Sequence, residues 1–461
     1  MNFNLNKALK LVTAIVFLLN ALLICNFILY PIVSADSGYY LAIAREFYQG
    51  KTYFVDIGTI YNPLAIVTVG LPFLLDSNPD IRYHILINIG IIILVGFCFY
   101  KLSTSFLKKK EWNYLLTGFF VLLLLYNDGR YVILEPLSVV FQLVALIFYL
   151  NYLKTHAISR LFVMGIGISL AFLSKQYGLF IAIPIGLSML MNKRALLIQI
   201  AVTAFGCVIP LVVFYISIHN STFTIADFVQ SILGKGFAID NGNGTGLELD
   251  FKSRMLFLLI FIATNLYLIV LPFYLNRALN TKHFVMITVA LFSSFTVLFF
   301  AFYQHYFIYV IPYLLLLFAL VIDQTHTNLF QWKAFILVAI SIGLMTYSLA
   351  SSFNSKKEIY QSQLKYASQL NAIVPPNSKV YLSGIMPSFY YSCQFNSIDS
   401  KKVSYAFSGY LFTSTIVKYL DKGEYLVVSK DSYKAYQKVI ADLKVSKHLI
   451  DKEEIYIIQK E

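Results

Sequence analysis

The residues best suited to chemistry in this sequence of 461 residues are carboxylates just outside an apolar segment. Asp36, Glu46 and Asp56 fall within a polar, tyrosine-rich stretch, residues 35–64, that follows the first apolar run. The stretch is too polar to cross a bilayer, and a carboxylate held at a membrane surface can accept a proton. The pattern therefore predicts chemistry on the extracytoplasmic face of a membrane.

The composition is that of a protein that crosses a membrane many times. The chain is 58% hydrophobic and 13% charged, with a mean hydropathy of +0.70, whereas soluble domains carry about 25% charged residues. The net charge of +13 does not indicate a nucleic-acid partner, because the basic residues lie between apolar runs rather than in one patch. Three of the four cysteines lie in apolar runs, so we expect neither disulfides nor a zinc site. No cofactor is expected, and dependence on a metal is left open.

Eleven apolar segments approach the length of about 20 residues that a transmembrane helix needs. They cover residues 9–31, 82–102, 113–126, 134–153, 160–174, 177–191, 195–218, 255–275, 283–302, 307–323 and 333–352. A further apolar piece, Leu64–Leu75, is shorter and bounded by Pro63 and Pro79, which favours a re-entrant or interfacial helix. The expected fold is a polytopic α-helical membrane protein.

The distribution of basic residues predicts which side of the membrane each loop faces. With the amino terminus inside and Leu64–Leu75 not crossing, thirteen Lys and Arg residues lie on the inner side, including the cluster at 108–110, and eight lie in the outer loops. Because cytoplasmic loops are enriched in Lys and Arg, we place the first loop, 32–81, and the loop 219–254 outside. The expected location is the cytoplasmic (inner) membrane. The Gly- and Asn-rich loop 219–254 is either a lid or acceptor-binding loop or a plain flexible connector.

A change of composition predicts two domains: a membrane domain over 1–353 and a small extracytoplasmic α/β domain over 354–461. Within the second domain, periodicity predicts helices over 356–370, 413–420 and 432–443 and strands over 379–383, 425–429 and 454–458. The domain carries no phosphate loop, dinucleotide fingerprint or metal-spaced cluster. We expect it to pack over the outer mouth of the membrane domain rather than to carry catalysis.

Acids and cations collect at the outer ends of the predicted spans, where a charge near lipid depth needs a partner or a function. The set comprises Asp36, Arg82, the stretch Asn127–Tyr131, Glu135, Lys175 and His305. Each member also has a purely structural interpretation: Asp36 or Glu135 can cap a helix, Lys175 can extend to the headgroups, and His305 can belong to an aromatic interface belt. The functional interpretation depends on the set as a whole.

The order of these motifs resembles that of a known family. The pattern D-x-x-Y-Y-x-x-x-A-x-x-x-x-x-G, then Y-x-x-D, then Y-x-P-L is similar to the first outer loop of GT-C glycosyltransferases that use polyprenyl-phosphate sugars, such as aminoarabinose transferases and protein O-mannosyltransferases. The matching residues are Asp36, Tyr39, Tyr40, Ala44, Gly50, Tyr53, Asp56, Tyr61, Pro63 and Leu64, followed by Arg82, Glu135-Pro136-Leu137, Lys175 and Tyr306…Pro312. Asn62-Pro63 departs from the pattern, because many members have a basic residue and paired prolines there.

The resemblance, which covers about residues 1–325, implies an inverting transfer of a sugar from a polyprenyl-phosphate donor to a lipid, polysaccharide or protein acceptor of the cell envelope. It implies Asp36 as the base, with Asp56 and Glu135 orienting hydroxyl groups. The leaving phosphate needs cations. The implied donor-phosphate residues are Lys175, Arg82, Arg130 and His305, and the implied sugar- or acceptor-binding residues are Tyr39, Tyr40, Tyr61 and Tyr306. The sequence has no evident metal-ligand cluster, so no metal is included.

The alternative function is transport or flipping of a lipid-linked or small solute. A transporter is expected to bury polar groups at mid-bilayer on broken helices. Gly165, Gly167, Pro184 and Pro210 interrupt predicted spans, but no acid or cation lies mid-span. That pattern favours an enzyme acting at the membrane surface. A non-catalytic relative is a third possibility, which the presence of both Asp36 and Lys175 disfavours.

Overall fold

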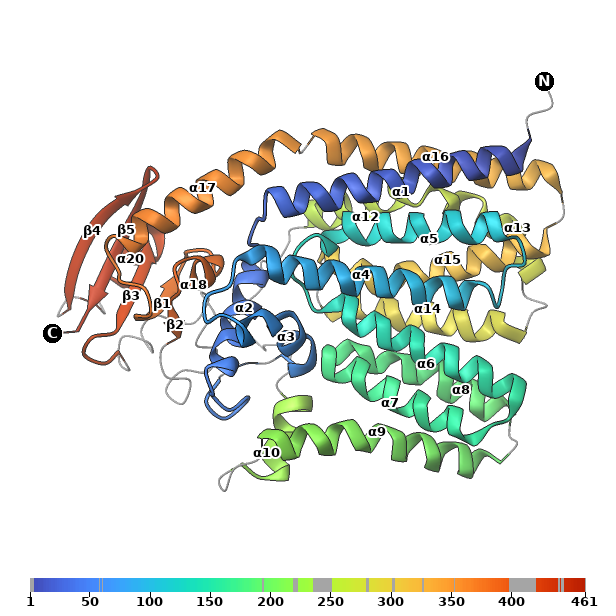
Figure 1. Cartoon of the computed structure of the whole chain (residues 1–461), viewed down its shortest axis with the longest axis horizontal. Coiled ribbons are helices and arrows are strands. Elements are labelled where there is room, and N and C mark those ends of the chain that lie inside the picture. Colours follow the sequence, from blue (N-terminus) through green and yellow to red (C-terminus); the bar gives the residue numbers. More distant parts are fainter. Residues whose placement is uncertain are drawn as a thin grey trace.

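A computed structural model shows a bundle of long, roughly parallel helices with a small sheet at one end (Figure 1). The structure describes residues 4–460 apart from 58, 60, 193–194, 219–222, 235–250, 279–281, 301–302, 326, 352, 398–419, 438–439 and 441–442. Most of the predicted lid or connector, 219–254, and nearly all of the predicted helix 413–420 therefore lie outside the described residues. The described amino terminus lies at the end of the bundle farthest from the sheet (Figure 1).

Among the residues that the structure describes, six helices are long and apolar enough to cross a membrane. These are α1 (Leu5–Leu29), α4 (Ile81–Ser103), α6 (Glu135–Thr155), α9 (Leu196–Ile218), α15 (Phe307–Gln324, with the short turn η6, Gln304–Tyr306, before it) and α16 (Asn328–Ser351). The other helices of the bundle are α5 (Lys110–Leu124), α7 (Ile158–Ser174), α8 (Ala182–Asn192), α12 (Phe251–Thr264), α13 (Leu271–Ala278) and α14 (Lys282–Phe300). The polytopic helical class is present, whereas the count of eleven spans is not confirmed.

The predicted span 255–275 is not one helix. It is broken into α12, a short turn η5 (Leu266–Ile269) and α13. Asn265 leaves helical geometry at φ −124° and ψ 45°, and its side-chain amide donates to the Phe261 carbonyl at 2.8 Å. Pro272 at the start of α13 has no N–H to donate to a preceding turn. An apolar run alone did not reveal this break.

The apolar piece Leu64–Leu75 forms two short helices, α3 (Pro63–Val69) and η1 (Leu71–Leu74). Pro63 is the first residue of α3, where the missing proline N–H would have no partner in the helix, and Pro72 is the second residue of η1. At about 1.5 Å per residue, neither piece reaches across a hydrocarbon core of about 30 Å.

The helix α15 forms the centre of the bundle. Every residue from Phe307 to Ile322 is buried, as expected for a helix that is hydrophobic on all sides. α9 has the opposite environment, with most of its apolar side chains outward. A helix with an apolar outer face is stable next to lipid, so the two helices mark the inside and the lipid-facing surface of the bundle.

The carboxyl-terminal part contains a five-stranded sheet of order β2-β1-β3-β5-β4. Its strands are β1 (Lys379–Ser383), β2 (Asn396–Ser397), β3 (Tyr425–Ser429), β4 (Lys444–Ile450) and β5 (Glu453–Gln459), with helices α17 (Phe353–Asn371), α18 (Ser388–Ser392) and α20 (Lys430–Tyr436). β1 pairs in parallel with β2 and β3, whereas β5 pairs antiparallel with β3 and β4. The three predicted strands, 379–383, 425–429 and 454–458, are present as β1, β3 and β5.

β4 was missed, and the helix predicted over 432–443 is shorter than expected, since α20 ends at Tyr436. β4 lies at the edge of the sheet and carries lysines among its apolar residues, so its pattern is weak. It joins β5 through Asp451 and Lys452, both in the left-handed region at φ 45° and 74°. Such a turn matches the twist of a two-residue hairpin.

The carboxyl-terminal part contacts the short helix α2 (Ala35–Tyr48) and the loop after η1. Gln363 of α17 makes two hydrogen bonds with the backbone of Val33, at 3.2 and 2.9 Å. A side chain on Gly38 would collide with the backbone of Ser388 in α18, so only glycine allows this close approach. Tyr391 donates to the Pro79 carbonyl at 2.6 Å. α2 is therefore held between the bundle and the carboxyl-terminal part.

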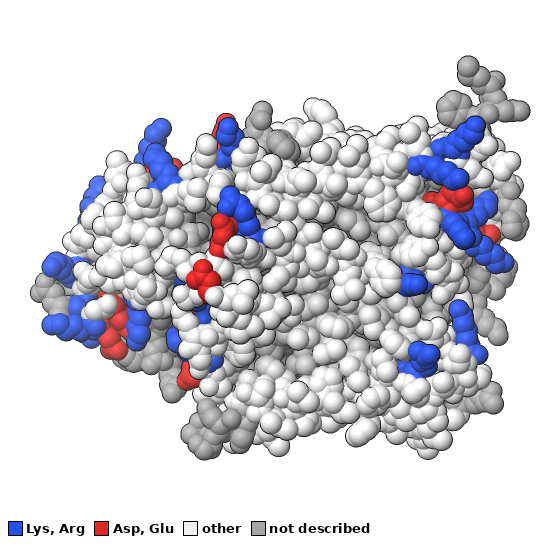
Figure 2. All heavy atoms as spheres, viewed as in Figure 1, with Lys and Arg blue, Asp and Glu red and all other residues white. Residues whose placement is uncertain are grey.

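Charged side chains gather at the two ends of the molecule, and a broad surface between them has almost none (Figure 2). The end away from the sheet shows mainly Lys and Arg, whereas the end with the sheet shows both signs (Figure 2). An uncharged band between two charged ends is the surface expected of a membrane-spanning bundle.

Candidate active site

The centre of the candidate site is a buried ion pair between two helix ends. The Lys175 ammonium lies 3.0 Å from the Glu135 carboxylate, with side chains 3% and 0% exposed. His305 Nε2 lies 3.9 Å from the same Glu135 oxygen. The three residues come from α6, from the end of α7 and from η6, so tertiary structure unites predicted site residues 170 positions apart in sequence.

Local sequence explains why both members of the pair stand at helix ends. Glu135 is the first residue of α6, and Pro136 follows it within the first turn, where proline is favoured. Lys175 is the residue after α7 and has an extended backbone at φ −157° and ψ 139°. The chain then turns through Gly178, whose N–H donates to the Lys175 carbonyl at 2.8 Å. A side chain on Gly178 would collide with the Ala171 carbonyl oxygen.

Three tyrosine rings surround the Lys175 ammonium. Its nitrogen lies 4.8 Å from the centre of the Tyr61 ring and 5.7 Å from those of Tyr40 and Tyr306. Tyr39 and Tyr40 contact Tyr61 edge to face, with ring centres 5.6 and 5.1 Å away. Aromatic faces attract cations, so the rings partly compensate the loss of water around the ammonium.

Burial raises the pKa of Tyr40 and of Tyr61 well above the ordinary value. The negative charges of Asp36 and Glu135 act in the same direction on both phenols. Both tyrosines therefore remain protonated at neutral pH and can donate hydrogen bonds to a ligand.

Asp36 lies in the first turn of α2, half-buried, within electrostatic range of Tyr40 and Tyr61. It is not the cap of this helix, because the Ser34 side chain caps it by accepting from the Ser37 N–H. The structural interpretation of Asp36 as a helix cap is therefore wrong.

The loop between α5 and α6 brings Asp128 and Arg130 toward the same region. Asp128 has a left-handed backbone at φ 64° in the irregular turn η2 (Leu125–Gly129). Burial raises the pKa of its carboxyl, whereas the charges of Arg130 and His305 oppose that rise. The sequence placed Asp128 in the polar stretch Asn127–Tyr131 but gave it no role of its own. Its position depends on a left-handed backbone that the sequence does not reveal.

Two predicted site residues have other partners. Arg82 forms an ion pair with Asp80 at 2.7 Å and donates to the Ile28 carbonyl at 3.1 Å, at the junction of α1 and α4. Asp56 accepts from the Thr52 N–H at 2.9 Å within its own loop. The sequence order alone had grouped both of them with Lys175, whereas these contacts lie at the α1–α4 junction and within the first loop.

The departure at position 62 also has a structural explanation. Asn62 is fully buried, and its side-chain amide donates to the Phe172 carbonyl at 2.5 Å. It ties the end of the first loop to the last turn of α7, three residues before Lys175.

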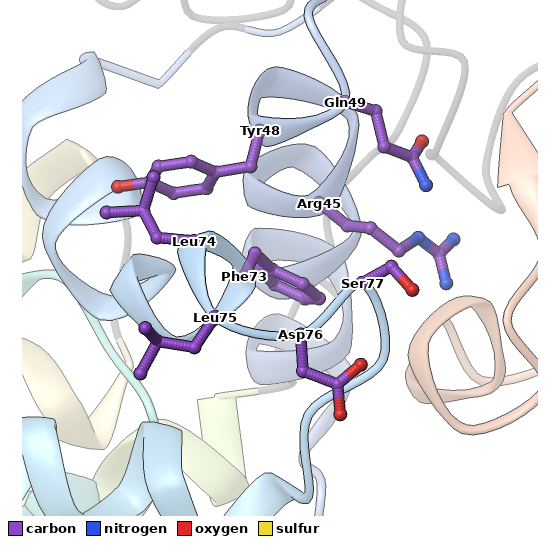
Figure 3. Close-up of a pocket in the computed structure, with 8 residues that line it drawn as sticks. All are labelled: Arg45, Tyr48, Gln49, Phe73, Leu74, Leu75, Asp76 and Ser77. Atoms are coloured by element: carbon purple, nitrogen blue, oxygen red, sulfur yellow. The ribbon is translucent and has the colours of Figure 1, made fainter.

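A surface hollow of about 150 Å³ lies beside α2, between that helix and η1 (Figure 3). The guanidinium of Arg45 and the carboxylate of Asp76 both approach its mouth (Figure 3). Arg45 also donates to the Phe395 carbonyl of the carboxyl-terminal part. The lining residues are Arg45, Tyr48, Gln49, Phe73, Leu74, Leu75, Asp76 and Ser77. None belongs to the Lys175 cluster, so the hollow is a separate feature of the first loop.

No group of three or more His, Cys, Asp or Glu side chains within the described ranges is placed to hold a metal ion.

Comparison with solved structures identifies the fold. ArnT, the aminoarabinose transferase from Cupriavidus metallidurans, in its structure with undecaprenyl phosphate, matches with a TM-score of 0.63 at 13% identity, covering 98% of each chain. Its apo structure matches with a TM-score of 0.64 at 13% identity, over 97% of this chain and 98% of that one. The oligosaccharyltransferase from Archaeoglobus fulgidus, in complex with Zn and sulfate, matches with a TM-score of 0.52 at 14% identity. The match covers 93% of this chain and 69% of the oligosaccharyltransferase.

These neighbours are GT-C glycosyltransferases, and this chain has their fold. No family model and no curated protein matches the sequence. The two ArnT matches cover nearly the whole of this chain, so they include both the helical bundle and the carboxyl-terminal part.

Proposed function

We propose that this protein is an integral membrane glycosyltransferase that moves a sugar from a polyprenyl-phosphate donor to a hydroxyl acceptor of the cell envelope. The observation that carries the proposal is the buried Glu135–Lys175 pair, enclosed by tyrosines at one end of a bundle with the GT-C fold. ArnT from Cupriavidus metallidurans, which has the same fold, binds undecaprenyl phosphate. A cation at the end of the spans suits the phosphate of such a donor.

The proposed reaction is a single displacement at the anomeric carbon of the sugar. The acceptor oxygen forms a bond to that carbon while the bond to the phosphate oxygen breaks, which inverts the configuration. The acceptor proton passes to Asp36, and the polyprenyl phosphate leaves with the electron pair. Asp36 suits the base because it is half-buried, and so reachable, in the first turn of α2.

Lys175 is proposed to stabilise the negative charge that grows on the leaving phosphate, with His305 and Arg130 nearby. Glu135 holds Lys175 in place and leaves one oxygen for a sugar or acceptor hydroxyl. The protonated phenols of Tyr40 and Tyr61 would donate to the same ligand. Arg82 and Asp56 would support the first loop from outside this cluster.

The proposed orientation places the sheet and the Lys175 cluster on the extracytoplasmic side of the inner membrane. The basic end of the bundle faces the cytoplasm, in agreement with the enrichment of Lys and Arg in cytoplasmic loops (Figure 2). The membrane domain comprises 1–353 and the soluble domain 354–461.

The test is transfer of radiolabelled sugar from a panel of polyprenyl-phosphate sugars to host envelope extract, with the purified full-length protein. We expect transfer from at least one donor, and a loss of about 100-fold or more in Asp36→Asn. Asp431→Asn, which changes a fully exposed carboxylate of the soluble domain, is the matched control and should retain transfer. Equal transfer by Asp36→Asn would remove Asp36 as the base. No transfer from any donor, with lipid still moving between leaflets of vesicles, would favour a flippase.

A further inference from the structure

A buried lysine and a partly buried arginine, Lys356 and Arg130, lie near the ends of α1, η2 and α17, outside the Glu135–Lys175 pair. Lys356 is 5% exposed, and its ammonium is a buried donor without a hydrogen-bond acceptor among the described residues. It lies 4.9 Å from the centre of the Phe27 ring at the end of α1. The Nε of Arg130 is likewise buried without an acceptor in the described part of the chain. Its ion pair with Asp128 is long, at 3.8 Å.

Both cations line one small hollow. Its volume is about 10 Å³, which is room for roughly one oxygen atom. The remaining lining residues are aromatic or aliphatic: Phe27, Tyr30, Ile32, Ile85 and Tyr131. The hollow thus contains two positively charged donors and no carboxylate in its lining.

Such an arrangement is unfavourable unless an acceptor joins it. A buried ammonium without an acceptor loses its hydration, and a second cation beside it adds repulsion. Burial, followed by the charge of Arg130, lowers the pKa of Lys356 to about 8. An anion whose oxygen entered the hollow would satisfy both donors and remove the repulsion.

We propose that Lys356 and Arg130 bind the phosphate of a lipid, with one phosphate oxygen in the hollow and the rest of the group at its mouth. The hollow lies where α1 ends and α4 begins, which is the headgroup depth of a bilayer around two membrane-spanning helices (Figure 1). Its apolar lining suits the first carbons of a lipid chain. The site deepens the proposed function and rests on it only for the identity of the lipid.

The experiment measures thermal shifts of the detergent-purified full chain with three probes: undecaprenyl phosphate, undecaprenol and inorganic phosphate. The variants are Lys356→Met and Lys356→Arg, with Lys357→Met as the control because Lys357 is the exposed neighbour on the same helix. We expect undecaprenyl phosphate to raise the Tm of the wild type and of Lys357→Met. The affinity should fall at least tenfold in Lys356→Met and recover in part in Lys356→Arg.

The probes separate the possible sources of the phosphate. A Lys356-dependent shift with undecaprenyl phosphate alone supports a lipid phosphate. A Lys356-dependent shift of the same size with inorganic phosphate would keep the anion site but overturn its assignment to a lipid. Equal shifts in the wild type and Lys356→Met, or a shift with undecaprenol as large as with its phosphate, would overturn the site itself, and the hollow would then be filled by water.

The transfer assay keeps this inference separate from the proposed function. If sugar transfer depends on Asp36 but lipid binding does not depend on Lys356, only the Lys356–Arg130 site is refuted. If lipid binding depends on Lys356 but the protein transfers no sugar, only the proposed glycosyltransferase activity is refuted.

Discussion

Lys175 and Glu135 are each buried, so each depends on the other for its charge to be tolerated. Removing one partner leaves an uncompensated charge, which typically costs about 3–5 kcal/mol. The pair therefore has a structural effect that must be separated from its proposed effect on the donor phosphate.

A double-mutant cycle makes that separation. We expect Lys175→Met to lower the free energy of unfolding by about 3 kcal/mol and Glu135→Gln in addition to restore most of it. Donor binding should stay weak in the restored double mutant, because the cation is still missing. The measurements are denaturation in detergent and donor affinity. Normal donor affinity in a stable double mutant would contradict the assignment of Lys175 to the phosphate.

Lys356 predicts a pH dependence of stability in the lipid-free protein. Its pKa is about 8 in the folded protein against an ordinary value of 10.5. Between these values the unfolded chain holds more protons, so the stability that this group controls rises with pH. The loss of folding free energy from burying the charged ammonium is present in full below pH 8, where both states are protonated. It disappears above pH 10.5, where both states are neutral.

Lys356→Met should therefore raise the Tm at pH 7, and its advantage over the wild type should shrink toward pH 10. Thermal unfolding of both proteins across this range, without phosphate or phospholipid, is the measurement. If the difference in Tm between Lys356→Met and the wild type does not change with pH, the Lys356 ammonium is solvated in the folded protein.

At the scale of elements, the turn between α7 and η3 (Gln176–Ile181) positions Lys175. Gly178 lies against the Ala171 carbonyl and the Ser138 hydroxyl, so an added methyl group must move backbone rather than a flexible side chain. The turn at η3 can thus pack closely against α6 and α7 only because residue 178 has no side chain.

Gly178→Ala should displace this turn, cost about 1–3 kcal/mol and reduce transfer at least tenfold while helical content is retained. Gly186→Ala in α8 is the matched control, since a side chain there meets only open space. Circular dichroism and the transfer assay give the comparison. If the folded Gly178→Ala protein transfers sugar as well as the wild type, the turn at Gly178 is not needed to position Lys175 for the reaction.

At the scale of the whole molecule, the fold separates a basic end from an end that carries the sheet (Figure 2). The proposed orientation makes Lys357, at the sheet end, extracytoplasmic, and Thr104, exposed just after α4, cytoplasmic.

Cysteine labelling tests this orientation. In whole cells, a membrane-impermeant thiol reagent should label Lys357→Cys, and it should label Thr104→Cys only after permeabilisation. The native cysteines Cys98 and Cys393 are buried, and the unsubstituted protein measures any background from Cys25 and Cys207. The reverse pattern would invert the topology and place the Lys175 cluster in the cytoplasm.

The sequence by itself determined the class of the protein and much of its secondary structure. Long apolar runs can only be stable as helices in lipid, so α1, α4, α6, α9, α15 and α16 followed from composition. Alternating apolar residues likewise predicted β1, β3 and β5. Local sequence patterns did not predict two features of the fold. One is the break after α12, and the other is the edge strand β4, whose lysines weaken its apolar pattern.

Only the tertiary structure decided which of the outer polar residues meet. Lys175, Glu135 and His305 come together because three helices end at the same depth, whereas Arg82 and Asp56 bind partners in their own neighbourhoods. The tyrosine enclosure of Lys175 and the Lys356–Arg130 hollow likewise depend on contacts between residues far apart in sequence. Sequence patterns report the local preferences of a chain, but the pairing of buried charges is set by how the helices pack.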